Sequence, residues 1–325
     1  MTMRESVAGK NILVTGGAGF IGSHLVDRLV AEGAAHVVVI DNLFVGSEAN
    51  LAEAMASGRV TFYRDDAEFA TSLEYIFANH TIDVVFNCAT KALNYSFLNP
   101  ANAFDTNVKV VLNLLELQRR GLFNTLCHFS TSEVYGSAVY EPMDEAHPRN
   151  PTTTYAAGKA AADMAVESYV RMFGVDAYIV RPFNNYGPRQ NHKGMLAGVI
   201  PITAVRLLTG GTPEIHGEGT QSRDFIYVHD TVDAVLKLHT ALPAGDTVNI
   251  STDNQISINE LIPRICSYYG YVGEVLRKPA RHSDVLSHNA SNEKVKGLIR
   301  YQLTPFEQGL AETLDWYTNL VGKQI

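Results

Sequence analysis

Tyr155 and Lys159 form a Tyr-x-x-x-Lys pair in a stretch of helical periodicity. Four residues span about one turn of an α-helix, so both side chains would lie on the same face. An ammonium group beside the phenol would lower the pKa of Tyr155. A phenolate in this position could accept a proton from a substrate hydroxyl as a general base. The same spacing occurs on many surface helices, so its meaning depends on the residues that precede it.

Three glycines, Gly16, Gly19 and Gly22, directly follow a strand-like run and open a helical stretch. Glycine permits a tight turn and lets backbone N–H groups approach a pyrophosphate closely. The positive end of the following helix would face the same phosphates. A plain loop is the alternative, but the strand–loop–helix context favours a dinucleotide site.

Asp41 ends the second strand-like run, 19 residues after Gly22. A carboxylate there can accept both hydroxyls of an adenosine ribose and would repel a 2′-phosphate. Because no arginine follows immediately, the sequence predicts NAD rather than NADP, with a helix-capping aspartate as the alternative. With NAD bound, Tyr155 could take the proton of a sugar hydroxyl while a hydride leaves for the nicotinamide.

The elements that would position these residues are short apolar runs that alternate with helical stretches up to about residue 181. The predicted strands are 11–15, 36–40, 60–63, 83–87, 125–130 and 177–180, and the predicted helices include 21–31, 103–118 and 154–173. Strands that are apolar throughout and separated by helices indicate a parallel sheet buried on both faces. We therefore predict an α/β fold with a doubly wound, Rossmann-type parallel sheet. In this prediction, residues 1–181 form the NAD-binding domain and carry the catalytic residues.

Residues 182–325 are punctuated by glycine and proline, which predicts a smaller C-terminal lobe that binds the substrate. Helices are expected at 257–268 and 305–320. Some segments of this half could return to the main sheet, and 248–250 is the candidate.

The composition argues against several classes of protein. The chain has 325 residues and a formal net charge of -8, which disfavours a nucleic-acid or anionic-membrane surface. No run approaches 18 apolar residues, and the polar N-terminus does not resemble a secretory signal. The cysteines Cys88, Cys127 and Cys266 fit no disulfide framework, which predicts a cytoplasmic protein. The eleven histidines show no ligand spacing, so no metal site is expected.

Several motifs together resemble one family. They are TGGAGFIG at 15–22, Asp41, STSEVYG at 130–136, YAAGK at 155–159 and RPFNNYGPRQ at 181–190. In combination they resemble the extended short-chain dehydrogenase/reductase superfamily over nearly the whole chain. Within it, they are most similar to the NAD-dependent nucleotide-sugar 4,6-dehydratases.

The resemblance implies a catalytic role for each residue near the proposed base. Tyr155, with Lys159 beside it, would deprotonate the 4-hydroxyl of the sugar during its transient oxidation, and Thr131 would hydrogen-bond the 4-oxygen. Glu133 would remove the C5 proton, which the 4-ketone makes acidic, so that the 6-hydroxyl leaves as water. Hydride return to C6 would give a 4-keto-6-deoxy sugar. Ser132 would stand where many dTDP-glucose dehydratases carry an aspartate that protonates the leaving group.

Alternatives to dehydration remain open at this point. Thr-Ser-Glu also occurs in UDP-glucuronate decarboxylases, although residues 151–154 lack the arginine that those enzymes often carry near the tyrosine. Nucleotide-sugar 4-epimerases usually lack an acid at the position of Glu133. A net-redox reductase would keep Tyr155 and Lys159 without needing Glu133, and a non-catalytic NAD-binding module is the non-enzyme alternative.

The resemblance also implies two sets of binding residues. The expected NAD contacts are Gly16, Gly19, Phe20, Ile21, Gly22, Asp41, Asn42, Asp66, Ala67, Cys88, Ala89, Thr90, Asn107, Ser130, Tyr155 and Lys159. The expected substrate contacts are Lys91, Asn184, Arg189, Arg223 and Arg281, with arginine suited to a diphosphate. The substrate would be a UDP-, dTDP-, GDP- or CDP-linked sugar. The loop 89–96 is slightly shorter than in similar proteins, so the sugar is left unassigned.

The superfamily commonly forms homodimers through two helices of each subunit, one before the fifth strand and one that carries the Tyr-x-x-x-Lys motif. The resemblance therefore implies a homodimer. Alanines at 156–157 and 160–162 would allow close approach of a partner helix. Tight packing on the protein's own sheet would use the same alanines.

Overall fold

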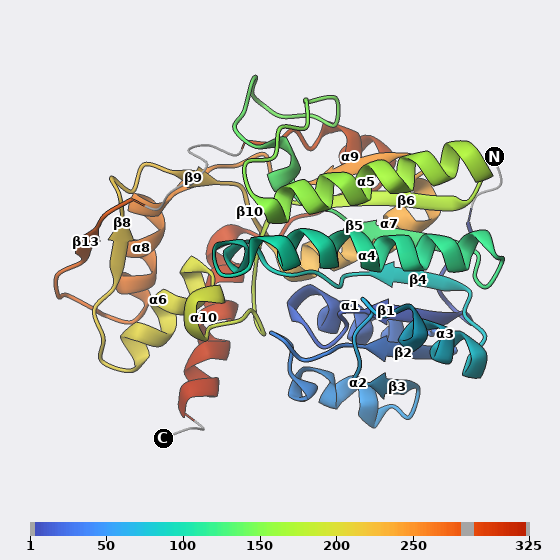
Figure 1. Ribbon diagram of the computed structural model, residues 1–325. Helices are drawn as coiled ribbons and strands as arrows, with labels where there is room; N and C mark the ends of the chain where they lie inside the picture. The colour runs from blue at the N-terminus through green and yellow to red at the C-terminus, as the bar shows by residue number, and fades with distance from the viewer. Residues whose placement is uncertain (1–3, 281–288, 323–325) are drawn as a thin grey trace.

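The main sheet has seven parallel strands in the computed structural model, which describes residues 4–280 and 289–322 (Figure 1). Its order is β11-β6-β5-β4-β1-β2-β3. The strands are β1 (Asn11–Thr15), β2 (His36–Ile40), β3 (Val60–Tyr63), β4 (Val84–Asn87), β5 (Thr125–Phe129), β6 (Asp176–Pro182) and β11 (Thr247–Ile250). The predicted doubly wound α/β fold is confirmed, and each of the six predicted strands is present.

Helices cover both faces of the sheet. The helices of the first 181 residues are α1 (Phe20–Ala31), α2 (Ala52–Ala56), α3 (Ala70–Asn79), α4 (Pro100–Arg119) and α5 (Thr154–Phe173), with 3-10 turns η1 (Glu48–Leu51), η2 (Leu93–Phe97) and η3 (Ser132–Tyr135). One face packs on α1 together with α7 (Val228–Ala241) and α9 (Glu293–Leu298). The other face packs on α3, α4 and α5.

Strand alternation explains the two cores, because successive side chains of a strand point to opposite faces. Ile12 and Val14 of β1 belong to the core beneath α1, whereas Leu13 belongs to the core beneath α4. Both faces are therefore apolar, as expected for a sheet covered on both sides.

The smaller C-terminal lobe lies beside one end of the sheet (Figure 1). Its elements are β7 (Asn184–Tyr186), η4 (Gly194–Leu196), α6 (Val199–Leu208), β8 (Glu214–His216), β9 (Ser222–Arg223), β10 (Phe225–Tyr227), β12 (Ile256–Ser257), α8 (Ile258–Tyr268), β13 (Leu276–Lys278) and α10 (Phe306–Gly322). Apolar residues of α6, α8 and α10 form its core. Strand β11 pairs with β6, so 247–250 returns to the main sheet. The division of the chain at residue 182 stays a prediction.

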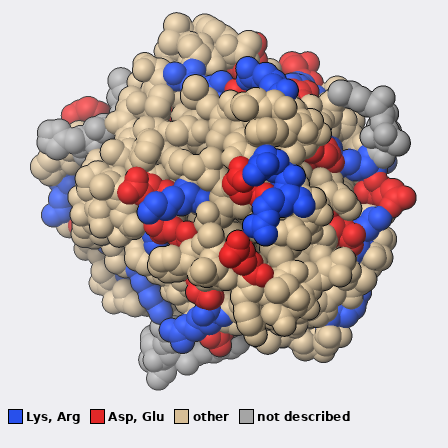
Figure 2. Space-filling view, turned by 45° about the vertical axis from the view of Figure 1, so that its right-hand side comes forward, with Lys and Arg blue, Asp and Glu red and all other residues tan. Residues whose placement is uncertain are grey.

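The surface carries charges of both signs. On the face shown in Figure 2, lysine and arginine side chains are interspersed with aspartate and glutamate, and no broad region of one sign is visible. Among residues 4–280 and 289–322, no helix is both long and apolar enough to cross a membrane.

Candidate active site

A cavity of about 380 Å³ opens where the parallel strands of the main sheet end. Gly16 follows β1, Asp41 follows β2, Cys88 follows β4 and Ser130 follows β5, so four strand ends supply its walls. Ligands of doubly wound sheets bind at this edge, where the strand order reverses. The expected contacts that line the cavity are Gly16, Gly19, Phe20, Ile21, Gly22, Asp41, Asn42, Asp66, Ala67, Cys88, Ala89, Thr90, Lys91, Ser130, Thr131, Tyr155 and Lys159.

The glycine loop is built for close backbone contact. Gly16 has a φ of +68°, and a β-carbon on it would lie 2.7 Å from the backbone nitrogen of Ala89. A β-carbon on Gly22 would lie 2.2 Å from the carbonyl oxygen of Gly16. Helix α1 begins at Phe20, so its N-terminal N–H groups open toward the cavity that Phe20 and Ile21 line. The loop can therefore hold a phosphate group at the positive end of a helix.

Asp41 is held in place by the loops on either side of it. Its Oδ2 accepts the N–H of Ala18 at 3.0 Å, and its Oδ1 accepts the N–H of Leu43 at 2.8 Å. Burial raises the pKa of Asp41, and these N–H groups oppose that rise. A carboxylate has about four acceptor sites, so Asp41 can still accept a ribose hydroxyl.

Asn107, an expected NAD contact, holds a neighbouring loop with its side-chain oxygen, and its contact with NAD stays a prediction. Its side chain is almost completely buried and is not among the residues that line the cavity. Its Oδ1 accepts hydrogen bonds from the Lys91 N–H at 3.0 Å and the Thr90 hydroxyl at 2.9 Å. Asn107 therefore fixes the loop that forms one wall of the cavity.

Tyr155 and Lys159 both line the cavity from the first turns of α5. Burial raises the pKa of Tyr155 to about 12, although hydrogen bonds with the Thr131 and Thr90 side chains oppose this rise. The ammonium of Lys159 donates to the carbonyl oxygen of Phe129. Its pKa is lowered to about 8, again mainly by burial. The expectation that Lys159 would lower the pKa of the phenol is thus outweighed by burial of the phenol itself.

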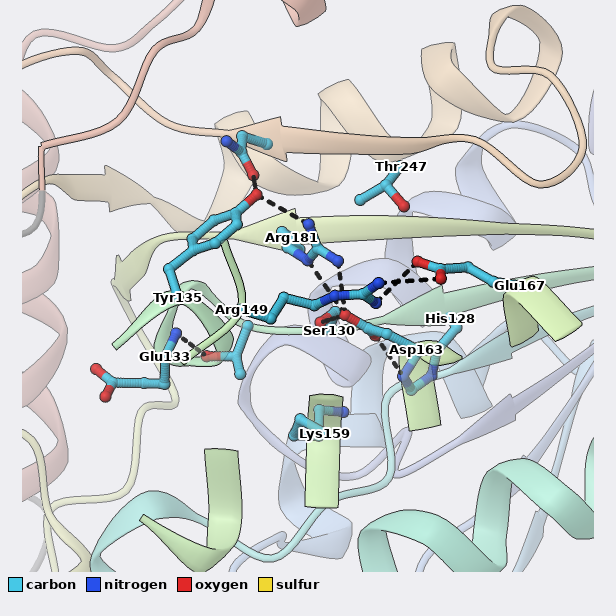
Figure 3. Close-up of polar contacts among 12 residues, drawn as sticks. His128, Ser130, Glu133, Tyr135, Arg149, Lys159, Asp163, Glu167, Arg181 and Thr247 are labelled. Atoms are coloured by element: carbon cyan, nitrogen blue, oxygen red, sulfur yellow. Dashed lines mark hydrogen bonds and ion pairs between the residues drawn. The ribbon is translucent and has the colours of Figure 1, made fainter. Parts of the chain in front are cut away.

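Glu133 lies in the short turn η3, which begins directly after Thr131. The Thr131 hydroxyl caps this turn by accepting the N–H of Glu133 at 3.3 Å. Glu133 is half-buried, and its negative charge raises the pKa of Tyr155. Its carboxylate extends away from the polar network around Asp163 and Arg181 (Figure 3). Thr131 lines the cavity, whereas Ser132 and Glu133 are not among the lining residues.

Lys91 is the expected substrate contact that the cavity contains. Its ammonium lies over the ring of Phe44, 4.3 Å from the ring centroid, and both residues line the cavity. Arg223 is in β9, outside the cavity lining, and its Nη1 donates to the carbonyl oxygen of Ser222 at 2.9 Å. Arg281 lies outside the described residues.

Two further expected substrate contacts lie outside the residues that line the cavity, and they stay predictions. Arg189 does not line the cavity, because its Nη1 is paired with Asp27 of α1 at 2.6 Å. Asn184 is also outside the lining, and its neighbour Asn185 lines the cavity instead. Alternate residues of a strand point to opposite sides, and Asn184 and Asn185 are consecutive in β7.

Gln190 was also missed, although it belongs to the same motif as the two asparagines. It lines the cavity, and its amide donates to the carbonyl oxygen of Asn185 at 3.2 Å. Its Oε1 is buried and has no hydrogen-bond partner among the described residues. The motif at 181–190 was the available signal, because it places a second amide close to Asn185.

Comparisons with known proteins agree with this geometry. A family model described as "NAD dependent epimerase/dehydratase family" matches residues 12–251. The chain is 33% identical over 309 residues to a putative UDP-glucose 4-epimerase of Methanocaldococcus jannaschii, covering 95% of this chain and 98% of that one. It is 32% identical over 321 residues to a dTDP-glucose 4,6-dehydratase of Actinoplanes sp., covering 94% and 97%.

Solved structures divide between the same two activities. A UDP-glucose 4-epimerase from Thermotoga maritima superposes with a TM-score of 0.90 at 33% identity, covering 96% of this chain and 99% of that one. A dTDP-glucose 4,6-dehydratase from Streptomyces venezuelae, solved with NAD bound, superposes with a TM-score of 0.91 at 30% identity, covering 96% and 98%.

Proposed function

The chain belongs to the NAD-dependent epimerase/dehydratase family, and we propose that it is a nucleotide-sugar 4,6-dehydratase. Epimerases and dehydratases of this family share the same fold, so the choice between them depends on individual side chains. The observation that carries the proposal is Glu133, a half-buried carboxylate in the turn that follows Thr131, which is a residue of the cavity wall. Such a carboxylate is what proton removal at C5 requires.

The residues of the cavity fit NAD. The glycine loop leaves no room for β-carbons where a pyrophosphate would approach, and Asp41 retains lone pairs for a ribose. Bound NAD supplies the hydride acceptor at C4 of the sugar and the hydride donor at C6. Lys91, with its ammonium at the cavity wall, is a cation that could bind an anionic group of either ligand.

The protein's own side chains would handle the protons of the reaction. Tyr155 accepts the 4-hydroxyl proton, and Thr131 orients the 4-oxygen beside it. Burial raises the pKa of the Tyr155 phenol, so a positive charge nearby is needed to stabilise the phenolate. Lys159 supplies that charge only while it is protonated. Glu133 takes the C5 proton and becomes a carboxylic acid. It can then return that proton to the 6-hydroxyl, which leaves as water.

A 4-epimerase is the second candidate, because two relatives, at 33% and 34% identity, are named as a putative UDP-glucose 4-epimerase and a UDP-glucose 4-epimerase. Ser132 also cannot donate a proton to a leaving group as a carboxylic acid does. An epimerase would use Tyr155 and Lys159 in the same way and would leave Glu133 without a proton to remove. Decarboxylation of a UDP-glucuronate is the third possibility, since a UDP-glucuronic acid decarboxylase is 30% identical over 316 residues.

One incubation separates these activities. The purified protein is mixed with UDP-glucose, dTDP-glucose, GDP-mannose, CDP-glucose and UDP-glucuronate in parallel, and the products are weighed by mass spectrometry. Loss of the mass of water from a glucose or mannose nucleotide supports dehydration. An unchanged mass with inverted C4 indicates epimerisation, loss of carbon dioxide indicates decarboxylation, and accumulating NADH indicates net redox chemistry.

We also propose that the enzyme is a homodimer that pairs through α4 and α5. These helices lie side by side on one face of the sheet (Figure 1). Their outer surfaces expose large apolar side chains, namely Phe104, Leu112, Met164, Met172 and Phe173. Apolar surface gathered on neighbouring helices is typical of a protein–protein interface.

A further inference from the structure

Tyr135 ends the turn that carries Glu133, and its side chain is completely buried. Its hydroxyl donates to Oδ1 of Asn249 on β11 at 2.8 Å and accepts from Nη1 of Arg181 on β6 at 2.8 Å. The guanidinium of Arg181 also lies 5.0 Å from the centroid of the Tyr135 ring. One phenol thus ties η3 to two strands of the main sheet (Figure 3).

Arg181 continues this connection to the helix of Tyr155 and Lys159. Its Nε and Nη2 donate to Oδ2 of Asp163, at 3.2 and 2.8 Å, and both side chains are almost completely buried. The same oxygen accepts the Ser130 hydroxyl at 2.7 Å. Asp163 is four residues after Lys159 in α5, so the two side chains lie on the same face of the helix.

The second carboxylate oxygen of Asp163, Oδ1, faces His128. Nε2 of His128 lies 3.5 Å from Oδ1 of Asp163, and Nδ1 of His128 is 3.1 Å from Nδ2 of Asn87. Burial holds the pKa of His128 well below its ordinary value, so the ring is neutral at physiological pH. Arg181, which is paired directly with Asp163, therefore compensates the buried charge of that carboxylate.

Backbone contacts restrict the turn η3 on the side opposite the Tyr135 ring. Gly136 follows it with a φ of +64°, and a β-carbon there would lie 2.0 Å from the carbonyl oxygen of Asn150. The N–H of Asn150 donates to the carbonyl oxygen of Val134 at 3.0 Å. The Asn150 backbone therefore restrains η3 on one side, and the contacts of the Tyr135 side chain restrain it on the other.

We propose that Tyr135 is a positioning residue, whose hydroxyl holds Glu133 in place relative to Tyr155 through Arg181 and Asp163. This proposal rests on the proposed role of Glu133 as the base at C5. A general base must lie within hydrogen-bond reach of the carbon-bound proton, and a misplacement of about 1 Å can cost roughly 100-fold in rate. Tyr155 is carried by α5 and Thr131 directly follows Ser130 at the end of β5, whereas Glu133 lies inside η3. Loosening the Tyr135 end of η3 therefore affects the C5 step more than oxidation at C4.

The test is the substitution Tyr135→Phe, which keeps the packed ring and removes only the hydroxyl. Tyr178→Phe is the matched control, because Tyr178 is an equally buried tyrosine of β6 whose hydroxyl contacts His239, away from the cavity. Amide hydrogen exchange of residues 131–136 reports the turn. With UDP-glucose and dTDP-glucose as probes in deuterated water, absorbance of the reduced nicotinamide reports C4 oxidation, and deuterium incorporation reports the C5 step.

For Tyr135→Phe, we expect faster exchange across 131–136, C4 oxidation within about threefold of the unsubstituted protein, and C5 deuteration reduced roughly tenfold or more. Tyr178→Phe should change none of the three. Unchanged exchange in the turn, or C4 oxidation that falls as far as C5 deuteration, would overturn the proposal.

A second variant, Arg181→Lys, tests the same proposal if Tyr135→Phe does not fold. Arg181→Lys keeps a cation beside Asp163 but presents one nitrogen where arginine presents three. Arg181 also borders a polar cavity of about 320 Å³, where a lysine ammonium could stay hydrated. We expect the same selective loss of C5 deuteration, and its absence in both variants would contradict the proposal.

The two proposals can fail separately. If the unsubstituted protein oxidises C4 of a probe without deuterating C5, the dehydratase assignment fails. The positioning role of Tyr135 is then decided by hydrogen exchange in 131–136 alone. If the unsubstituted protein deuterates C5 and Tyr135→Phe does so equally well, the dehydratase assignment stands and the role of Tyr135 fails.

Discussion

Gly22 rests against the carbonyl oxygen of Gly16 so closely that a β-carbon on Gly22 would lie 2.2 Å from that oxygen. Helix α1 can begin directly beneath the glycine loop only because Gly22 lacks a side chain. The loop cannot yield easily, because a β-carbon on Gly16 would in turn meet the backbone of Ala89.

We therefore expect Gly22→Ala to weaken NAD binding at least tenfold, because the loop must shift away from the position in which it holds phosphate. Isothermal titration calorimetry with NAD measures this. Gly297→Ala in α9 is the control, since a β-carbon there meets nothing within 4 Å and its affinity for NAD should not change. Equal affinity of the Gly22 variant and the unsubstituted protein would contradict this reading of the loop.

Asp41→Asn should lower the affinity for NAD by roughly 10- to 100-fold, because hydrogen bonds to a charged acceptor contribute about 1.5–3 kcal/mol. The affinity for NADP should fall less or rise, since the carboxylate no longer repels the 2′-phosphate. Titration with both cofactors gives the ratio. A ratio of the two affinities that does not change would show that Asp41 is only a structural acceptor for Ala18 and Leu43.

Lys159 makes stability depend on pH in a definite direction. Its pKa is about 8 in the folded protein and 10.5 at its ordinary value, so burial disfavours the charged form. Between these pH values the unfolded chain binds a proton that the folded protein has released, and stability therefore rises with pH. The rise should be on the order of 3 kcal/mol at most.

Urea unfolding from pH 7 to pH 10.5 tests this, with Lys159→Met as the comparison. The difference in stability between the variant and the unsubstituted protein should be largest near pH 7 and shrink as the pH rises. Parallel curves for the two proteins would mean that Lys159 is not the group responsible.

The proposed dimer predicts that Met164→Glu on α5 yields monomers, because a charge would be buried at the centre of the apolar surface. Light scattering should give the unsubstituted protein about twice the chain mass of 35.6 kDa. Val272→Glu is the control, since Val272 is 99% exposed in the C-terminal lobe. A monomeric unsubstituted protein would rule out the dimer.

The sheet could be predicted from the sequence because its strands are short, continuous apolar runs. The runs 11–15, 36–40 and 60–63 match β1, β2 and β3 residue for residue, and 154–173 matches α5. Helix α4 begins three residues before the predicted 103, because Asn99 caps it and Pro100 fits its first turn. Helix α7 was missed, because the glycines before it suggested only short elements.

The site was less predictable, because its details depend on contacts between distant segments. The ion pair of Arg189 with Asp27 joins residues 162 positions apart, and no local pattern signals it. Tyr135, Asp163 and Arg181 likewise meet only after the sheet has formed. The burial of Asn107 could not be predicted either, because the resemblance supplied only its residue type.

Tyr155→Phe removes the group proposed to deprotonate the 4-hydroxyl, and it should reduce oxidation at C4 by at least about 100-fold. Stopped-flow absorbance of the reduced nicotinamide with dTDP-glucose and UDP-glucose measures this step. A variant that still oxidises C4 at the full rate would remove Tyr155 from the mechanism.

The most direct measurement is the fate of the C5 proton in Glu133→Gln, followed in deuterated water with dTDP-glucose and UDP-glucose. The variant should still reduce its NAD at a measurable rate, while deuterium incorporation at C5 and loss of water both fall by roughly 100-fold or more. If Glu133→Gln releases water as fast as the unsubstituted protein, Glu133 is not the base at C5 and the dehydratase mechanism proposed for this protein is wrong.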